Sequence, residues 1–189
     1  VRPNGDLIVG GGFQSVNDVP AVGVARWDGM AWQSLDEGLH HSFGSNGVAY
    51  SVLTLPDGSV MVGGAFERAG TIQTDSVARW DGTSWQALGR GLKGYVYSLT
   101  LLPDGRVAAG GEMWGHWPDD GRSFAVWEGA AWRFKLPLRT SASIECLTVL
   151  PNGGIFAGGT FNSLQELAYS NAAIWNEAAG WSGFGPGIY

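Results

Sequence analysis

The chain has 189 residues, of which 17 are acidic and 11 basic, so its formal net charge is −6. It contains no cluster of lysine or arginine, which argues against nucleic acid and anionic membranes as partners. No apolar run approaches the roughly 20 residues of a membrane-spanning helix. The single cysteine, Cys146, excludes an internal disulfide framework. The 31 glycines follow no collagen period and indicate many tight turns.

Four segments of the chain share one pattern. They read RPNGDLIVGGGF at 2–13, LPDGSVMVGGAF at 55–66, LPDGRVAAGGEM at 102–113 and LPNGGIFAGGTF at 150–161. A tryptophan follows the first glycine of each doublet by 17 residues, in the pairs Gly10 and Trp27, Gly63 and Trp80, Gly110 and Trp127, and Gly158 and Trp175. Because one separation is kept four times, the chain is predicted to contain four internal repeats.

Each repeat is predicted to hold four β-strands, named A to D. In the third repeat they are YSLTLL at 97–102, RVAAGG at 106–111, SFAVW at 123–127 and AWRFKL at 131–136. PDG or PNG closes turn AB and WDG or WEG closes turn CD, because glycine supplies the positive φ that such turns require. In the first repeat the expected strands lie near 7–10, 24–28 and 32–35. Helical periodicity is missing throughout, so we expect no helix longer than about one turn.

A four-stranded repeat cannot bury both faces of its sheet alone, so the repeats must stack. Radial stacking gives a β-propeller, and an extended solenoid is the alternative, although its repeats are usually shorter. We therefore predict an all-β fold, a β-propeller built of four-stranded antiparallel blades, as a single region over residues 1–189. The repeats are expected at about 1–39, 48–92, 95–138 and 143–187.

The first repeat lacks strand A, and Ile188 and Tyr189 could only begin another one after the fourth repeat. A ring normally closes with one blade built from both termini, and an unpaired blade edge is an aggregation hazard. We therefore expect the chain to be part of a larger ring, or to complete its sheet with another chain. The expected partners include the remaining blades of the same longer chain or another subunit.

The glycine doublet after an apolar strand, followed by two spaced aromatic residues across a turn, resembles the kelch repeat over essentially the whole chain. Tryptophan stands where kelch repeats usually have tyrosine. The sequence is thus more similar to the divergent kelch-like repeats of bacterial and fungal surface proteins. This resemblance implies an extracellular or cell-surface scaffold, although some kelch-like propellers carry oxidase or glycan-cleaving activities.

Eight of the ten tryptophans are expected to be framework residues. They form pairs that flank turn CD, namely Trp27 and Trp32, Trp80 and Trp85, Trp127 and Trp132, and Trp175 and Trp181. Their flat rings can pack between adjacent blades, and the glycine doublets let blades approach because no Cβ separates them. We therefore do not count these eight residues as binding candidates.

Strand alternation places turns AB and CD at one end of each blade and the longer BC and DA connections at the other. Binding residues are expected in the longer connections. Two of these depart from the repeat: GLHHSFGSNG at 38–47 and EMWGHWPDDGR at 112–122. The candidate ligand-binding residues are Trp114, His116, Trp117, Asp119, Asp120, Arg122, His40, His41 and Phe43.

Two aromatic residues beside carboxylates and an arginine suit a sugar or peptide site. The alternative is that Trp114 and Trp117 pack their loop onto the neighbouring blade while the charged groups are solvated. No metal or cofactor is expected. Adjacent His40 and His41 rarely present both rings to one ion, and no loop has zinc or calcium ligand spacing.

No nucleophile motif or phosphate loop is present. Cys146 aligns with Ser51 and Ser98 in strand A and is expected to be a small buried residue, whereas Glu145 could face a central channel or be solvated. The sequence therefore predicts a non-catalytic module that presents its loop face to a protein or glycan. The alternatives are a propeller domain of a carbohydrate-active or oxidase-type enzyme, and a structural subunit or fragment of a larger assembly.

Overall fold

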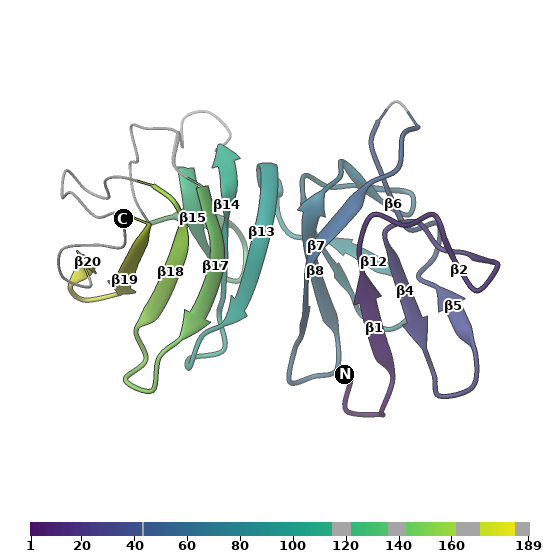
Figure 1. The fold of residues 1–189 in the computed structure, drawn as a ribbon, viewed down its shortest axis with the longest axis horizontal. Coiled ribbons are helices and arrows are strands. Elements are labelled where there is room, and N and C mark those ends of the chain that lie inside the picture. The colour runs from purple at the N-terminus through teal and green to yellow at the C-terminus, as the bar shows by residue number, and fades with distance from the viewer. Residues whose placement is uncertain (43, 115–121, 136–142, 162–170, 184–189) are drawn as a thin grey trace. The chain divides into compact units, whose positions relative to one another are not determined.

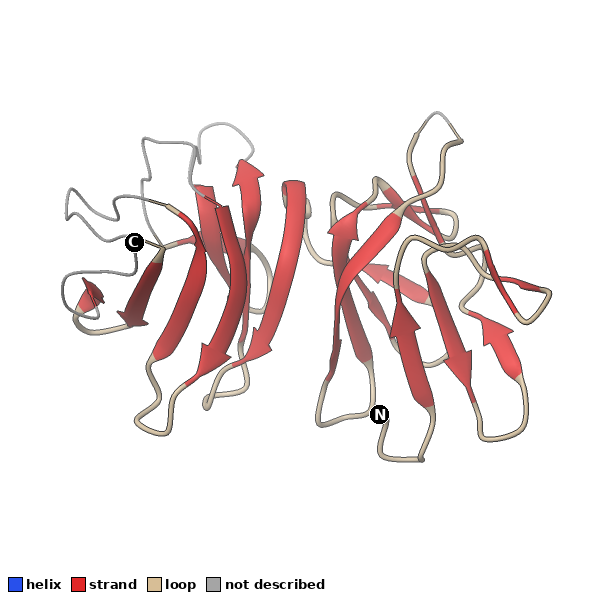
Figure 2. Cartoon of the chain, viewed as in Figure 1, coloured by secondary structure: helices blue, strands red, loops and turns tan. Residues whose placement is uncertain are grey.

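The computed structural model of the chain describes residues 1–42, 44–114, 122–135, 143–161 and 171–183. Every regular element in these residues is a β-strand, and they contain no helix (Figure 2). The chain divides into two compact units, residues 1–96 and residues 97–189, each with its own hydrophobic core. The expectation of an all-β fold is confirmed for the described residues.

The long strands form one antiparallel sheet per repeat (Figure 1). Sheet 1 contains β1 (Leu7–Gly10), β4 (Val24–Trp27) and β5 (Trp32–Ser34), which are strands B, C and D. Sheet 2 contains β7 (Val48–Thr54), β8 (Val60–Ala65), β11 (Val77–Trp80) and β12 (Trp85–Ala87). Sheet 3 contains β13 (Lys93–Leu101), β14 (Val107–Trp114), β15 (Arg122–Trp127) and β16 (Trp132–Phe134). Sheet 4 contains β17 (Ser143–Val149), β18 (Ile155–Thr160), β19 (Ala172–Asn176) and β20 (Gly180–Gly183).

The predicted strand order A–B–C–D is what sheets 2, 3 and 4 show, and the predicted strands of repeat 1 agree with β1, β4 and β5 to within one residue. Five short strands lie in the connections of the first compact unit. They are β2 (Ser15–Val16), β3 (Val19–Pro20), β6 (Leu39–His40), β9 (Arg68–Ala69) and β10 (Ile72–Gln73).

The AB turn of repeat 2 shows why the PDG motif closes a hairpin. Leu55 donates its N–H to the carbonyl oxygen of Ser59 at 2.8 Å, and Gly58 adopts a φ of 82°. The carboxylate of Asp57 accepts hydrogen bonds from the backbone N–H and the hydroxyl of Ser59 at 2.9 and 2.6 Å. Glycine is needed here because L-residues rarely adopt this backbone conformation.

The first glycine of each doublet faces the following repeat. A Cβ added to Gly10 would lie 2.7 Å from Cγ2 of Val52 and 2.8 Å from Cβ of Ala49. A Cβ added to Gly110 would lie 2.6 Å from Cγ2 of Ile144. Neighbouring sheets within each compact unit therefore approach through these positions, as the sequence predicted.

The second glycine of the doublet faces strand A of its own sheet. A Cβ on Gly64 would come within 3.0 Å of the carbonyl oxygen of Val48, and a Cβ on Gly159 would come equally close to that of Ser143. The pairing of strands A and B shifts register at this level in both sheets. The two glycines thus have different tasks, and the second one accommodates a β-bulge.

The residue that precedes strand C has a left-handed backbone in all four repeats, with φ of 74°, 56°, 68° and 64° at Gly23, Ser76, Ser123 and Asn171. Its carbonyl oxygen accepts a hydrogen bond from the second glycine of the doublet in repeats 1, 2 and 4, at 3.0, 3.0 and 3.1 Å. The bond fixes where strand C begins relative to strand B, whatever chain lies between them.

The paired tryptophans lie opposite each other on strands C and D, with ring centroids 5.3 Å apart for Trp80 and Trp85. Trp80 is 8% exposed, and Trp85 is buried and donates its Nε1–H to the carbonyl oxygen of Leu35 in repeat 1 at 3.0 Å. In the second compact unit Phe124 of repeat 3 packs on two rings of repeat 4, those of Trp175 and Trp181. These rings join consecutive repeats and are framework, as predicted.

Candidate functional site

The BC hairpin of repeat 3 is longer than the corresponding segments of the other repeats. Strand β14 continues to Trp114, which pairs with Arg122 of β15, whereas β8 ends at Ala65 and β18 at Thr160. Met113 is buried, and Trp114 beyond it is 46% exposed. Among the tryptophans that the structure describes, Trp114 is the exposed one. Its ring is therefore displayed at the end of a paired strand.

The rest of the predicted BC site is only partly described. His116, Trp117, Asp119 and Asp120 lie outside the described residues. Arg122 is the first residue of β15, and its backbone faces Trp114 in the register of the hairpin. The structure thus brings together two members of the predicted set, Trp114 and Arg122, through strand pairing.

The DA connection at 38–47 forms part of a sheet. Strand β6 pairs with β9, which in turn pairs with β10, so the connection adds a third strand to the BC hairpin of repeat 2. Leu39 is fully buried, and the half-buried His40 has Nε2 at 2.7 Å from the carbonyl oxygen of Glu37. The His40 ring therefore closes its own turn. Phe43 lies outside the described residues.

A carboxylate holds the tip of this connection. Glu67 accepts hydrogen bonds from the hydroxyl of Ser42 and from its backbone N–H, the latter at 2.9 Å. These bonds, with a smaller contribution from the charge of His41, lower the pKa of Glu67 below its ordinary value. The half-buried His41 thus lies in a tip whose acidic residue is engaged inside the protein.

Strand A carries exposed residues that the sequence did not single out as a group. The register shifts leave Tyr50 of β7 and Glu145 of β17 as the extra residues of equivalent β-bulges, and both are exposed. Thr160 donates its hydroxyl to Glu145 at 2.8 Å. The signal available in the sequence was the second glycine of each doublet, because it is the residue that accommodates the bulge.

The expected burial of Cys146 is wrong, because this residue is exposed. In repeat 3 the aligned residue Ser98 faces the next repeat, and its hydroxyl accepts a hydrogen bond from the N–H of Leu147 at 3.0 Å. Among the described residues no further repeat packs on this face of sheet 4. The sulfur lies beside Gly158, 2.8 Å from where a Cβ would stand, on the face that Gly110 turns toward repeat 4. Cys146 therefore belongs to a surface of the kind that stacks repeats.

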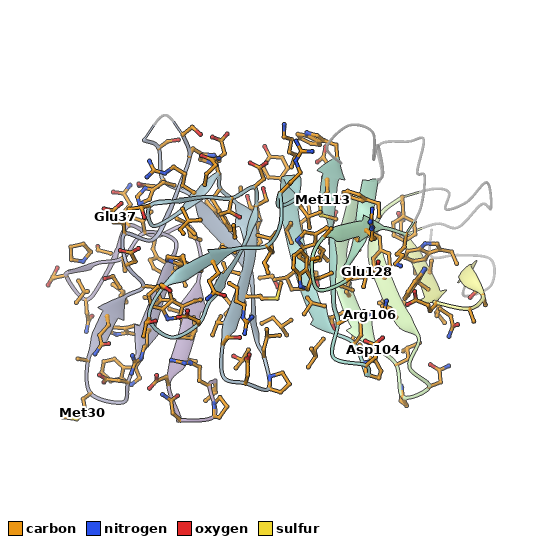
Figure 3. The ribbon with its side chains drawn as sticks, turned by 180° about the vertical axis from the view of Figure 1, so that it is seen from behind. Met30, Glu37, Asp104, Arg106, Met113 and Glu128 are labelled. Atoms are coloured by element: carbon orange, nitrogen blue, oxygen red, sulfur yellow. The ribbon has the colours of Figure 1, made fainter. Side chains whose placement is uncertain are left out.

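The turn ends of sheets 3 and 4 are joined by an ionic network that the sequence pattern did not indicate. Arg106 contacts Asp104 at 2.6 Å and Glu177 at 2.5 Å, and Lys135 contacts Glu128 at 2.5 Å and Glu177 at 3.4 Å (Figure 3). The hydrogen bond from Arg106 and the charge of Lys135 lower the pKa of Glu177, and bonds from the carboxylates raise that of Lys135. The network is partly exposed and consists of matched charges, so it contributes little stability.

Neither end of the sheets offers an evident catalytic pair. In the part of the chain that the structure describes, no three His, Cys, Asp or Glu side chains are grouped as a metal ion would require. The described carboxylates with lowered pKa are held by hydrogen bonds from neighbouring turn residues or cations. Among the same residues, no helix has the length and apolar character needed to cross a membrane.

The chain matches no family model and no curated protein. It is similar in structure to the extracellular domain of BT4673 from B. thetaiotaomicron, with a TM-score of 0.57 and 14% identity. That match covers 97% of this chain and 21% of the other, so the chain spans about a fifth of that protein's length. A second match is to YCF48 in the structure of YCF48 bound to D1 peptide, with a TM-score of 0.46, 16% identity and coverage of 84% and 45%. At these identities the first match shows a shared fold and nothing further.

Proposed function

We propose that the chain is a kelch-like β-propeller, or part of one, and that it acts as a non-catalytic interaction module. Its BC and DA end would contact a protein or a glycan. Four consecutive repeats with one strand order, and a fold shared with a solved extracellular domain over 97% of the chain, support the architecture. The kelch-like sequence pattern and the same likeness in fold support a place outside the cell or on its surface.

The exposed ring of Trp114 is the observation on which this function rests. The framework tryptophans are buried or half-buried in their sheets, whereas Trp114 is 46% exposed at the end of β14. Tryptophan is enriched among the residues that dominate binding energy at interfaces, because it offers a large rigid surface. Repeat 3 also extends its hairpin beyond the length seen in the other repeats, which places this ring away from the core.

Titration calorimetry tests the proposal. The probes are oligomers of glucose, galactose, mannose and N-acetylglucosamine, together with a library of unmodified peptides. One class of probe should bind saturably, and Trp114→Ala should weaken that binding by about 5- to 30-fold, as for an interface residue worth 1–2 kcal/mol. Met30→Ala is the matched control, because Met30 is 89% exposed but lies in the turn between β4 and β5.

Two results would contradict this function. Hydrolysis or oxidation of an oligosaccharide during the titration would move the protein to the enzyme alternative. Unchanged affinity of Trp114→Ala, with an unchanged circular dichroism spectrum, would place the binding surface elsewhere. Joint replacement of Trp114 and Trp117 by alanine should abolish binding while the protein stays folded. Unfolding of that variant would favour the alternative in which both residues pack the loop.

A further inference from the structure

The outer edge of β1 differs from the corresponding edge of the other B strands. In sheets 2, 3 and 4, strand B lies between strands A and C, because β7, β13 and β17 occupy its outer side. β1 pairs with β4 on one side, and within the described residues no strand pairs with the other side. Its outward N–H and C=O groups are a template for a further strand.

The side chains of β1 reflect the same open edge. Leu7 and Val9 occupy the positions that Val60 and Val62 hold in β8, as the matching register with strand C shows. Val60 and Val62 are fully buried, whereas Leu7 is 38% exposed and Val9 is half-buried. The open edge is therefore bordered by apolar side chains that the equivalent strand covers.

Gly11 supplies a second and independent observation. At the equivalent Gly64 a Cβ would collide with the carbonyl oxygen of Val48 in strand A, so glycine is required there. At Gly11 the nearest atom to an added Cβ is Cδ1 of Phe13 at 3.2 Å, and Gly11 does not have a left-handed backbone. Neither its own conformation nor its described neighbours require glycine. The requirement appears when a strand with a β-bulge lies beside β1.

We propose that the edge of β1 binds an extended peptide with the sequence pattern of strand A of this chain. The peptide lies antiparallel to β1, as β7 lies on β8, with its β-bulge opposite Gly11. In the β7 register a small residue, Ala49, faces the second glycine, and Ser51 faces the first. Apolar residues continue along the rest of the strand. This surface is formed by repeat 1 and is independent of the proposed function of Trp114.

The probe is the synthetic peptide NGVAYSVLTL, residues 46–55 of the chain, with a fluorescein label and two added lysines for solubility. Fluorescence anisotropy with the 189-residue protein should show saturable one-to-one binding. The same peptide with Val52→Pro should not bind, because proline cannot donate to a strand ladder and disrupts extended pairing. Equal binding of both peptides, or no saturable binding of the first, would overturn the proposal.

Two protein variants locate the peptide. Gly11→Ala should weaken binding at least tenfold, because its Cβ would collide with the bulged strand. Gly12→Ala should bind as the unmodified protein does, because repeat 2 has Ala65 at this position, in register with Val48. Thermal unfolding followed by circular dichroism establishes that both variants are folded. Unchanged peptide affinity in folded Gly11→Ala would contradict the assignment.

Two further measurements distinguish peptide binding at the edge of β1 from binding around Trp114 and from self-association. Trp114→Ala should bind the peptide normally, so a failure of the proposed function leaves this result unaffected. Sedimentation velocity tests a second copy of the chain as the occupant. A dimer that Gly11→Ala dissociates, together with no binding of the peptide, would overturn the peptide as the occupant and assign the edge to self-association.

Discussion

The N–H of Gly64 donates a hydrogen bond to the carbonyl oxygen of Ser76 at 3.0 Å, and Ser76 holds that oxygen in place with a left-handed backbone, at φ 56°. This bond lies where the chain returns from the BC connection into strand C. Because equivalent bonds occur in repeats 1 and 4, the BC connections can vary in sequence and shape while strands B and C keep their register. The repeats thus combine a fixed framework with variable connections.

Ser76→Val should destabilise the protein by about 2–3 kcal/mol. A branched side chain in a left-handed backbone costs roughly 1–2 kcal/mol, and the change also removes the hydrogen bond from the Ser76 hydroxyl to the carbonyl oxygen of Gly94. Ser76→Gly is the control, because it loses the same bond but relieves the backbone. Urea unfolding measures both free energies. Equal losses for the two variants would show that backbone strain is unimportant here.

Trp80→Ala should lower the free energy of unfolding by on the order of 3 kcal/mol or more, as truncation of a large aromatic residue does in a core. Trp80 packs on Trp85 and is 8% exposed. Trp114→Ala is the comparison and should cost less than about 1 kcal/mol, because its ring is largely solvated. A loss below about 1 kcal/mol for Trp80 would mean that its ring contributes little to the core.

Gly64→Ala should destabilise the protein by about 1–3 kcal/mol, because the added Cβ collides with the backbone oxygen of Val48 and forces strand A to move. Gly11→Ala, at the same position of repeat 1, should have a much smaller effect, since it meets only the adjustable ring of Phe13. Thermal unfolding of the two variants gives the comparison. A larger effect at Gly11 would show that its surroundings have been misjudged.

Stability should fall as the pH drops below the ordinary aspartate value of 3.8, and Asp81 should contribute to this loss. Hydrogen bonds from the N–H groups of Thr83 and Ser84 hold the pKa of Asp81 well below that value in the folded protein. Its contribution is therefore present above pH 3.8 and disappears as the pH falls toward the folded pKa. Asp81→Asn keeps an acceptor without the charge, as Asn176 does in repeat 4. Unfolding measured from about pH 5 to about pH 2 should vary less in this variant, and an identical pH profile would contradict the prediction.

The strands could be predicted because their signals are local. The doublets at Gly10 and Gly63 and the tryptophans at fixed distance mark strands B and C without any knowledge of packing. Strand β6 could not be predicted in this way. Two residues, Leu39 and His40, show no periodicity, and they become a strand because β9 offers them an edge.

The candidate site was less predictable for a related reason. The sequence identified Trp114 as an aromatic residue outside the repeat, and the structure exposes its ring. The sequence could not foresee that the His40 ring would be used inside its own turn. For Cys146, alignment with Ser98 gave the correct face of the sheet but not its exposure, because exposure depends on which repeat packs against that face.

The tryptophan pairs also determine how this protein absorbs polarised ultraviolet light. In three of the pairs the indole centroids lie 5.3–5.5 Å apart and the ring planes are inclined by 49–62°. Transitions of two chromophores held so closely and obliquely mix, and the mixed states rotate light in opposite senses. Far-ultraviolet dichroism of the chain therefore contains exciton couplets beside the signal of the strands. Loss of a couplet in a single-tryptophan variant would report the opening of one individual CD hairpin.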